Sequence, residues 1–398
     1  SSLWPRLADA LSAQGHKVLK VHVSLADRLH WRRRKGVSYT GTLPDWEGWL
    51  DDLIAREKVT DVLYHAEQHP YHLIARKVAR RHGATPWVLE FGYFRPDWLT
   101  LEEDGVNAYS KFPKAPAAIQ ALARNQPMPT FELLYPHGAL TEYLHETAYR
   151  FLDEIGRPFF PNYETDHQSN LLRETLPWLR DIVTLPVRKT LARRFSSRLE
   201  QDGTGFNLLA LQLQSDYQVR GGSPFANPDA FLDHVLASFA HHAPDNRLLV
   251  IKRHPQDTGI ENWPARLRQI SRRYGLEARV ELIKGGDLTT LLTHSRGAVM
   301  INSTTGIRAL QLGVPICALG RAAYNIAGIT HGAGLDSFWT NPEPPEPDLL
   351  QAFFRAIGAR QVHGSFYNIA GQKAAITGIA RLLAEQFDAK GASKPPAS

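Results

Sequence analysis

The chain has 398 residues, with 46 lysines and arginines against 40 aspartates and glutamates. At roughly 100–200 residues per domain, this length predicts two or three domains. A hydrophobic fraction of 43% and a charged fraction of 22% are typical of globular proteins and exclude collagen, a long coiled coil and wholesale disorder. The single cysteine, Cys317, excludes an internal disulfide, cysteine-based structural zinc and iron–sulfur clusters.

The net charge of +6 indicates a mild attraction to anionic surfaces. Basic residues gather within residues 32–35, 76–81 and 188–198. Two interpretations stay open: solvated helix faces, which charge runs usually form, or a surface that faces an anionic membrane. No apolar run reaches the roughly 20 residues of a membrane span, and no signal peptide is visible. Because the chain opens with Ser1 and Ser2 instead of Met, we expect a trimmed N-terminus that lacks a first strand.

Helical and strand patterns alternate over the first 90 residues. The periodicity of apolar residues predicts helices over residues 3–14, 45–56 and 72–82, and strands over residues 17–23, 61–64 and 86–90. Strands that alternate with helices imply βαβ units and a parallel sheet. Residues 115–200 look helical instead, with the longest candidates at 139–155 and 171–200. We interpret them as an insertion and connection within an N-terminal domain, residues 1–200.

A second and more regular alternation occupies residues 201–340. Strands are predicted over residues 207–214, 247–252, 279–283, 298–301 and 315–319, and helices over 229–241, 263–274, 288–295 and 303–312. A proline-rich break then precedes helices at 348–357 and 374–387, which we expect to pack back on the domains as residues 341–388. Residues 389–398 lack apolar periodicity and are predicted to be disordered.

The predicted fold is therefore α/β, with two Rossmann-like domains that face a cleft. This is the GT-B-like architecture of many nucleotide-sugar glycosyltransferases, and ligands are expected at the carboxyl ends of the strands. Several other signatures are absent from the sequence. There is no G-x-G-x-x-G after a strand, no P-loop, no H-E-x-x-H and no G-x-S-x-G. Dehydrogenases, P-loop NTPases, zinc proteases and serine hydrolases of those types are thereby excluded.

Two carboxylates follow predicted strands. Glu90 ends the strand 86–90, and it either pairs with Arg95 or acts as a general acid/base for a hydroxyl acceptor. Asp216 lies just past the strand 207–214, where it either caps a turn or attacks an anomeric carbon as a nucleophile.

Three further segments suit an anionic ligand. Lys252, Arg253, His254 and Pro255 end a strand, as an ordinary strand exit or as a phosphate contact. Asn302-Ser303-Thr304 leads from a strand into a helix, where the hydroxyls either cap the helix or help to bind an anion. The glycine-rich segment from Gly320 through Tyr324 to Trp339 suggests a loop that closes over a ligand.

Together and in this order, these segments resemble the capsule polysaccharide biosynthesis/export family of Gram-negative bacteria, and within it the KpsS-like retaining β-Kdo glycosyltransferases. The resemblance runs from Leu7 to about Trp339. The motifs that carry it are Glu90-x-Gly92-Tyr93-x-Arg95-Pro96, Thr100-Leu101-Glu102, Gly105-Val106-Asn107-x-x-Ser110, Gln212-x-x-x-Asp216-x-Gln218, His254-Pro255 and Asn302-Ser303-Thr304-x-Gly306. There are departures: Phe91 stands where relatives often carry a second acidic residue, and residues 64–72 replace a Gly-Asp-x-Arg-like turn.

The resemblance implies a transferase that moves Kdo, 3-deoxy-D-manno-oct-2-ulosonic acid, from CMP-Kdo to a phosphatidylglycerol-type or lysophosphatidylglycerol lipid. This reaction starts the poly-Kdo linker of a capsular polysaccharide on the cytoplasmic face of the inner membrane. The resemblance also implies a covalent adduct on Asp216 as nucleophile, with Glu90 as acid/base. The expected donor contacts are His254, Pro255, Lys252, Arg253, Asn302, Ser303, Thr304, Gly306, Gln212 and Tyr324. The expected acceptor or cleft contacts are Tyr93, Arg95, Asn107 and Ser110.

We expect no metal and no cofactor, since CMP is a good leaving group once its charge is matched. The expected partners are CMP-Kdo, the lipid acceptor, an anionic membrane surface and other capsule assembly proteins, without nucleic acid. Two alternatives stay open. One is a non-catalytic, glycolipid-binding component of capsule export, which would not need both Glu90 and Asp216. The other is a transferase of the same fold that uses a different sugar nucleotide.

Overall fold

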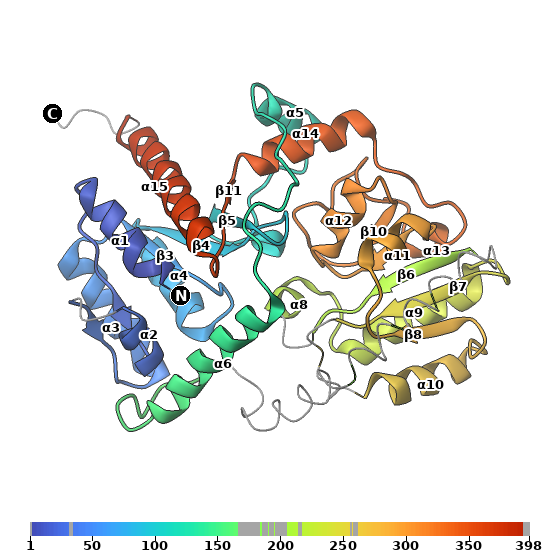
Figure 1. The fold of residues 1–398 in the computed structure, drawn as a ribbon, viewed down its shortest axis with the longest axis horizontal. Coiled ribbons are helices and arrows are strands. Elements are labelled where there is room, and N and C mark those ends of the chain that lie inside the picture. Colours follow the sequence, from blue (N-terminus) through green and yellow to red (C-terminus); the bar gives the residue numbers. More distant parts are fainter. Residues whose placement is uncertain are drawn as a thin grey trace. The chain divides into compact units, whose positions relative to one another are not determined.

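The computed structural model describes residues 2–31, 35–165, 205–213, 217–254, 257 and 262–392, with three single residues at 184, 190 and 195. The chain forms two compact units. Unit 1 comprises Ser1–Asp104, Pro129–Asp166 and Ile357–Ser398, and unit 2 comprises Gly105–Met128 and His167–Ala356. Residues 105–128, which the sequence assigned to the N-terminal domain, thus belong to unit 2, and the last helix belongs to unit 1. Figure 1 shows the helices and strands of both units.

Unit 2 contains a five-stranded parallel sheet with the order β10-β9-β6-β7-β8. Its strands are β6 (Phe206–Ala210), β7 (Leu248–Lys252), β8 (Val280–Ile283), β9 (Ala298–Met300) and β10 (Ile316–Ala318). The chain runs outward from β6 to β8 and then returns to the other side of β6 for β9 and β10. This is the doubly wound order of a Rossmann-like sheet, so the predicted α/β class is confirmed. Ligands bind such sheets beyond the carboxyl ends of the strands where the order reverses, which here is between β6 and β9.

Helices cover both faces of this sheet. The helices described in unit 2 are η1 (Asn107–Tyr109), α5 (Pro116–Ala123), α8 (Tyr217–Gly222), α9 (Pro228–His242), α10 (Trp263–Arg273), α11 (Leu288–His294), α12 (Thr305–Gln311), α13 (Leu335–Phe338) and α14 (Pro347–Gly358). Figure 1 shows α9 with α10 on one side of the sheet and α11 with α12 on the other. Because both faces are covered, a strand such as β7 is an unbroken apolar run whose Leu249, Val250 and Ile251 are fully buried.

Unit 1 has a four-stranded sheet with the order β11-β5-β4-β3. Its strands are β3 (Asp61–Tyr64), β4 (Thr85–Phe91), β5 (Trp98–Glu103) and β11 (Gln361–His363), and a separate parallel pair joins β1 (Val21–His22) to β2 (Val37–Ser38). The pair β3 and β4 is parallel, as the βαβ pattern predicted. β5 is antiparallel to β4, because the chain turns back after β4, and β11 is in turn antiparallel to β5. This sheet is therefore mixed.

Some helices of unit 1 pack on the mixed sheet, and others pack on neighbouring helices. They are α1 (Leu3–Ala13), α2 (Leu25–His30), α3 (Leu43–Glu57), α4 (Pro70–Arg81), α6 (Ala139–Ile155) and α15 (Ile369–Ala392). α1 and α15 bury Leu7 and Ile379 against Trp87 and Leu89 of β4, whereas α4 and α3 pack together. α6 has its predicted bounds. α15 is longer than predicted, so residues 389–392 are helical where disorder was expected. Of the helix expected over 171–200, residues 184, 190 and 195 are helical, and the rest lies outside the described residues.

Within the described ranges, no helix has both the length and the apolar character that crossing a membrane requires.

Candidate active site

A pair of side-chain amides marks the point where the order of the unit 2 strands reverses. Gln212 lies two residues beyond β6, and Asn302 lies two residues beyond β9. Gln212 Nε2 donates to Asn302 Oδ1 at 3.0 Å, and the Asn302 backbone N–H donates to Gln212 Oε1 at 3.1 Å. The two amides therefore bridge the carboxyl ends of the two strands where a doubly wound sheet binds its ligand.

Asn302 is buried, and neighbouring backbone surrounds it closely. Its Nδ2 donates to the Arg321 carbonyl at 3.3 Å, just beyond β10. Gly222, at the end of α8, approaches so closely that an added Cβ would lie 2.3 Å from this Nδ2. A larger residue than glycine would thus displace the Asn302 side chain.

The segment that opens α12 is closed by its own hydrogen bonds. Ser303 Oγ accepts the Thr305 N–H at 3.1 Å, and the Gly306 N–H donates to the Ser303 carbonyl at 2.9 Å. Tyr324 is fully buried, its hydroxyl donates to the same carbonyl at 2.6 Å, and burial raises the pKa of that hydroxyl. These bonds occupy N–H groups that a bound anion would use, so an anion here would rely more on the Ser303 and Thr304 hydroxyls.

Cationic side chains follow β7 and β8. Lys252 ends β7 and is only 9% exposed, and burial lowers the pKa of its ammonium while the Asp287 carboxylate acts in the opposite direction. Arg253 Nε donates to Asp257 Oδ2 at 2.9 Å, and Lys284 Nζ donates to the Asp257 carbonyl at 2.8 Å. Asp257 thus accepts hydrogen bonds from two cationic side chains that follow neighbouring strands. This edge of the sheet suits an anionic ligand.

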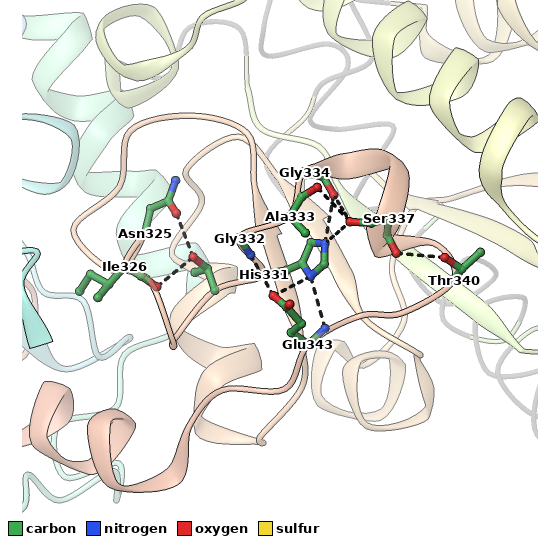
Figure 2. A network of polar contacts seen from close by, with 10 residues as sticks. Asn325, Ile326, His331, Gly332, Ala333, Gly334, Ser337, Thr340 and Glu343 are labelled. Atoms are coloured by element: carbon green, nitrogen blue, oxygen red, sulfur yellow. Dashed lines mark hydrogen bonds and ion pairs between the residues drawn. The ribbon is translucent and has the colours of Figure 1, made fainter.

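The glycine-rich segment after β10 is held in place by a polar network (Figure 2). The His331 ring is almost completely buried, with Nδ1 3.1 Å from Glu343 Oε2 and Nε2 2.8 Å from Ser337 Oγ. The Gly332 N–H also donates to Glu343 Oε2, at 3.1 Å. This network was not predicted from the sequence, because its members are separated by apolar residues and form no recognisable motif. Closure of the segment over a ligand stays a prediction.

A family model described as "Capsule polysaccharide biosynthesis protein" matches residues 60–367. The chain belongs to this family. The capsule polysaccharide modification protein LipB of Neisseria meningitidis serogroup A is 32% identical over 371 residues, which cover 91% of this chain and 88% of that protein. The capsule polysaccharide export protein KpsS of Escherichia coli is 30% identical over 348 residues, covering 87% and 89% respectively.

Solved structures share a more distant similarity with this capsule family member. The Thermosulfurimonas dismutans KpsC β-Kdo 2,7 transferase is 14% identical over 92% of this chain and all of that chain, with a TM-score of 0.46. The β-Kdo 2,4 transferase of the same KpsC is 17% identical over 82% of this chain and 88% of that one, with a TM-score of 0.43.

In unit 1 of the capsule family protein, Glu90 lies near the end of β4, as predicted. Its Oε1 accepts the Ala66 N–H at 2.6 Å, and its Oε2 lies 3.5 Å from His65 Nδ1. Arg95, the partner considered from the sequence, instead lies with its guanidinium 4.6 Å from the centre of the Phe91 ring. The carboxylate is 19% exposed, so it remains accessible to a substrate. His65 was not predicted, since an isolated histidine after a strand carries no specific signal.

The four expected acceptor contacts divide between the units. Tyr93 is buried in unit 1, where its hydroxyl donates to Glu102 Oε1 at 2.7 Å, whereas Arg95 is exposed. Asn107 and Ser110 belong to unit 2, and Ser110 Oγ accepts the Phe112 N–H at 3.1 Å. These contacts give Tyr93 and Ser110 local structural roles, and the acceptor role of all four stays a prediction.

The remaining predicted site residues fall into two groups. Asp216 and Pro255 lie outside the described residues. His254, half-buried, follows β7, and its carbonyl accepts the Asp257 N–H at 3.1 Å. Within the part of the chain that the structure describes, no group of three or more histidine, cysteine or acidic side chains is arranged to hold a metal ion.

Proposed function

We propose that this protein is a retaining β-Kdo glycosyltransferase that transfers Kdo from CMP-Kdo to a phosphatidylglycerol-type or lysophosphatidylglycerol lipid. The observation that carries the proposal is the Gln212–Asn302 pair at the strand reversal of unit 2, in a chain of the capsule polysaccharide biosynthesis family. Both residues belong to motifs by which the sequence resembles the KpsS-like transferases. The reaction would take place on the cytoplasmic face of the inner membrane and would start the synthesis of the capsule linker.

The edge of the unit 2 sheet suits the donor. CMP-Kdo carries a phosphodiester and a carboxylate, and positive charge is supplied by Lys252 at the end of β7 and Lys284 beyond β8, whereas Arg253 is paired with Asp257. The Thr304 hydroxyl, which has no hydrogen-bond partner among the described residues, is available to a phosphate oxygen. Charge-assisted hydrogen bonds of this kind stabilise the departing CMP.

The proposed reaction is a double displacement. The Asp216 carboxylate attacks C2 of Kdo, a C2–O bond to the protein forms, and the C2–O bond to phosphate breaks with its electron pair leaving on CMP. The acceptor hydroxyl then attacks the same carbon, Glu90 takes its proton, and the Asp216 carboxylate is released. Two inversions retain the configuration at C2.

An apolar surface on unit 1 supports a lipid acceptor and a membrane partner. On α6, Leu140, Leu144, Phe151 and Ile155 are 47–58% exposed, and their spacing places them on one face of the helix, which we call the α6 stripe. On the opposite face, the Tyr149 hydroxyl donates to Asp27 Oδ1 of α2 at 3.3 Å. An exposed apolar stripe without charged members is the pattern of a helix that lies in a bilayer interface.

Intact-protein mass spectrometry after mixing with CMP-Kdo, made in situ from Kdo and CTP, tests the donor and the nucleophile together. We expect a mass increase of one Kdo in the wild type and none in Asp216→Ala. A Glu90→Gln variant should form the adduct but fail to pass it to the lipid, since it cannot accept the proton from the acceptor hydroxyl. The same reaction with a chelator present tests the expected independence from metal ions.

Other results would change the assignment. Release of CMP without an adduct would keep the transferase and remove Asp216 as nucleophile. Neither adduct nor CMP release, even with the lipid present, would favour the non-catalytic glycolipid-binding component. Turnover of another sugar nucleotide, with CMP-Kdo left intact, would assign a different donor.

A further inference from the structure

Residues 105–114 directly follow β5 of unit 1 but are built into unit 2. The centre of this segment is Asn107, which is 7% exposed and has a φ of +49°. This left-handed conformation is one that asparagine adopts more readily than most residues.

The Asn107 side chain joins two loops at the proposed donor site. Its Nδ2 donates to the Asn302 carbonyl at 3.0 Å, and its Oδ1 accepts the Ala323 N–H at 3.1 Å. Both bonds are buried. Since Asn302 is itself paired with Gln212, three amide side chains connect the segment to the loops that follow β6, β9 and β10.

Two neighbours of Asn107 reinforce this connection. The Tyr109 hydroxyl donates to the Gly221 carbonyl at 3.1 Å, and its ring centre lies 5.0 Å from the Arg321 guanidinium. Lys114 Nζ donates to the carbonyls of Ala322 at 2.6 Å and Ala323 at 2.8 Å. The segment thus holds the end of α8 and residues 321–323 as well as Asn302.

We infer that Asn107 is a positioning residue for the donor site, which fixes the Asn302 carbonyl and residues 321–323 in the geometry that donor binding requires. This inference rests on the proposed function for the identity of the ligand. It adds a donor-side role to Asn107, because both of its amide atoms bond to backbone of the donor-side loops, and the acceptor role expected from the sequence stays a prediction.

The test compares Asn107→Gly with Asn125→Gly. Both asparagines lie in unit 2 with a left-handed φ, +49° and +63°, but Asn125 is exposed. Glycine accepts this φ, so each variant removes a side chain without straining the backbone. We expect Asn107→Gly to weaken CMP binding about tenfold by titration calorimetry, since two buried hydrogen bonds are lost. Asn125→Gly should bind as the wild type does.

Two further measurements separate positioning from general stability. The KM for CMP-Kdo should rise in Asn107→Gly. Hydrogen exchange without ligand should show faster exchange of the Ala323 amide in Asn107→Gly. Wild-type affinity and unchanged Ala323 exchange in Asn107→Gly would overturn the inference alone. A wild-type protein that binds neither CMP nor CMP-Kdo would overturn the proposed function, and the inference with it.

Discussion

The carboxyl of Asp153 is buried, and burial disfavours its charged form. It lies on α6 with both carboxylate oxygens buried. Burial raises the pKa of this carboxyl to about 6, against the opposing effect of the Ser24 hydroxyl, and the nearby Asp27 carboxylate raises it further. Between pH 4 and 6 the folded protein therefore holds a proton that the unfolded chain has released. The free energy of unfolding accordingly falls as the pH rises through this range.

Replacing Asp153 with Asn should remove this penalty, because the amide resembles the protonated carboxyl. We expect the gain in unfolding free energy over the wild type to grow by about 1–2 kcal/mol between pH 4 and 7, allowing for partial solvent screening. Urea denaturation at both pH values measures this difference. Glu154→Gln is the matched control, since Glu154 is exposed and its ion pair with Arg157 contributes little at either pH. A gain that does not depend on pH would refute the assignment.

At the scale of elements, one glycine in a helix is closely packed and another has open space around it. A Cβ added to Gly306 in α12 would lie 2.6 Å from the Tyr324 ring and 2.8 Å from Met300 Sδ. A Cβ added to Gly48 in α3 would meet nothing within 4 Å. α12 can therefore approach Tyr324 only because residue 306 is glycine. In α3, no close contact requires glycine at residue 48.

The same substitution should then have opposite effects in the two helices. We expect Gly306→Ala to lower the free energy of unfolding by about 1–3 kcal/mol, because Tyr324 must move away from the Ser303 carbonyl. Gly48→Ala should raise it by about 0.5–1 kcal/mol through reduced freedom of the unfolded chain. Chemical denaturation of both variants measures this. Equal and small effects would mean that the packing at Tyr324 is looser than the contacts indicate.

The position of a helix or strand is predicted well from the sequence when all its residues have the same environment. The strand β7 was predicted correctly, because burial on both faces of the sheet makes its sequence a continuous apolar run. β5 was missed, because its Glu102 is buried against the Tyr93 hydroxyl and interrupts the apolar pattern. The candidate site shows the same limit: it was predicted from strand ends, but the bond between Asn107 and Asn302 joins residues that are 195 positions apart. No local pattern reports a hydrogen bond between residues that only the fold brings together.

At the scale of the whole molecule, the exposed apolar side chains of the described residues are unevenly distributed. Eight large apolar side chains between Phe131 and Phe159 are at least 43% exposed, and four of them form the α6 stripe. The whole chain also carries a formal net charge of +6. Charge attraction to an anionic bilayer weakens with salt, whereas burial of apolar side chains does not, so salt separates the two contributions.

We expect the wild type to sediment with phosphatidylglycerol-containing vesicles, and part of this binding to persist at 0.5 M salt, where the Debye length is below about 8 Å. Leu144→Glu combined with Phe151→Glu should abolish the salt-resistant part, because two charges would have to enter the bilayer interface. Leu122→Glu is the control, since Leu122 is 43% exposed on α5 of unit 2. Vesicle binding that is wholly lost at high salt in the wild type would instead assign membrane association to the basic residues, and the α6 stripe would need another partner.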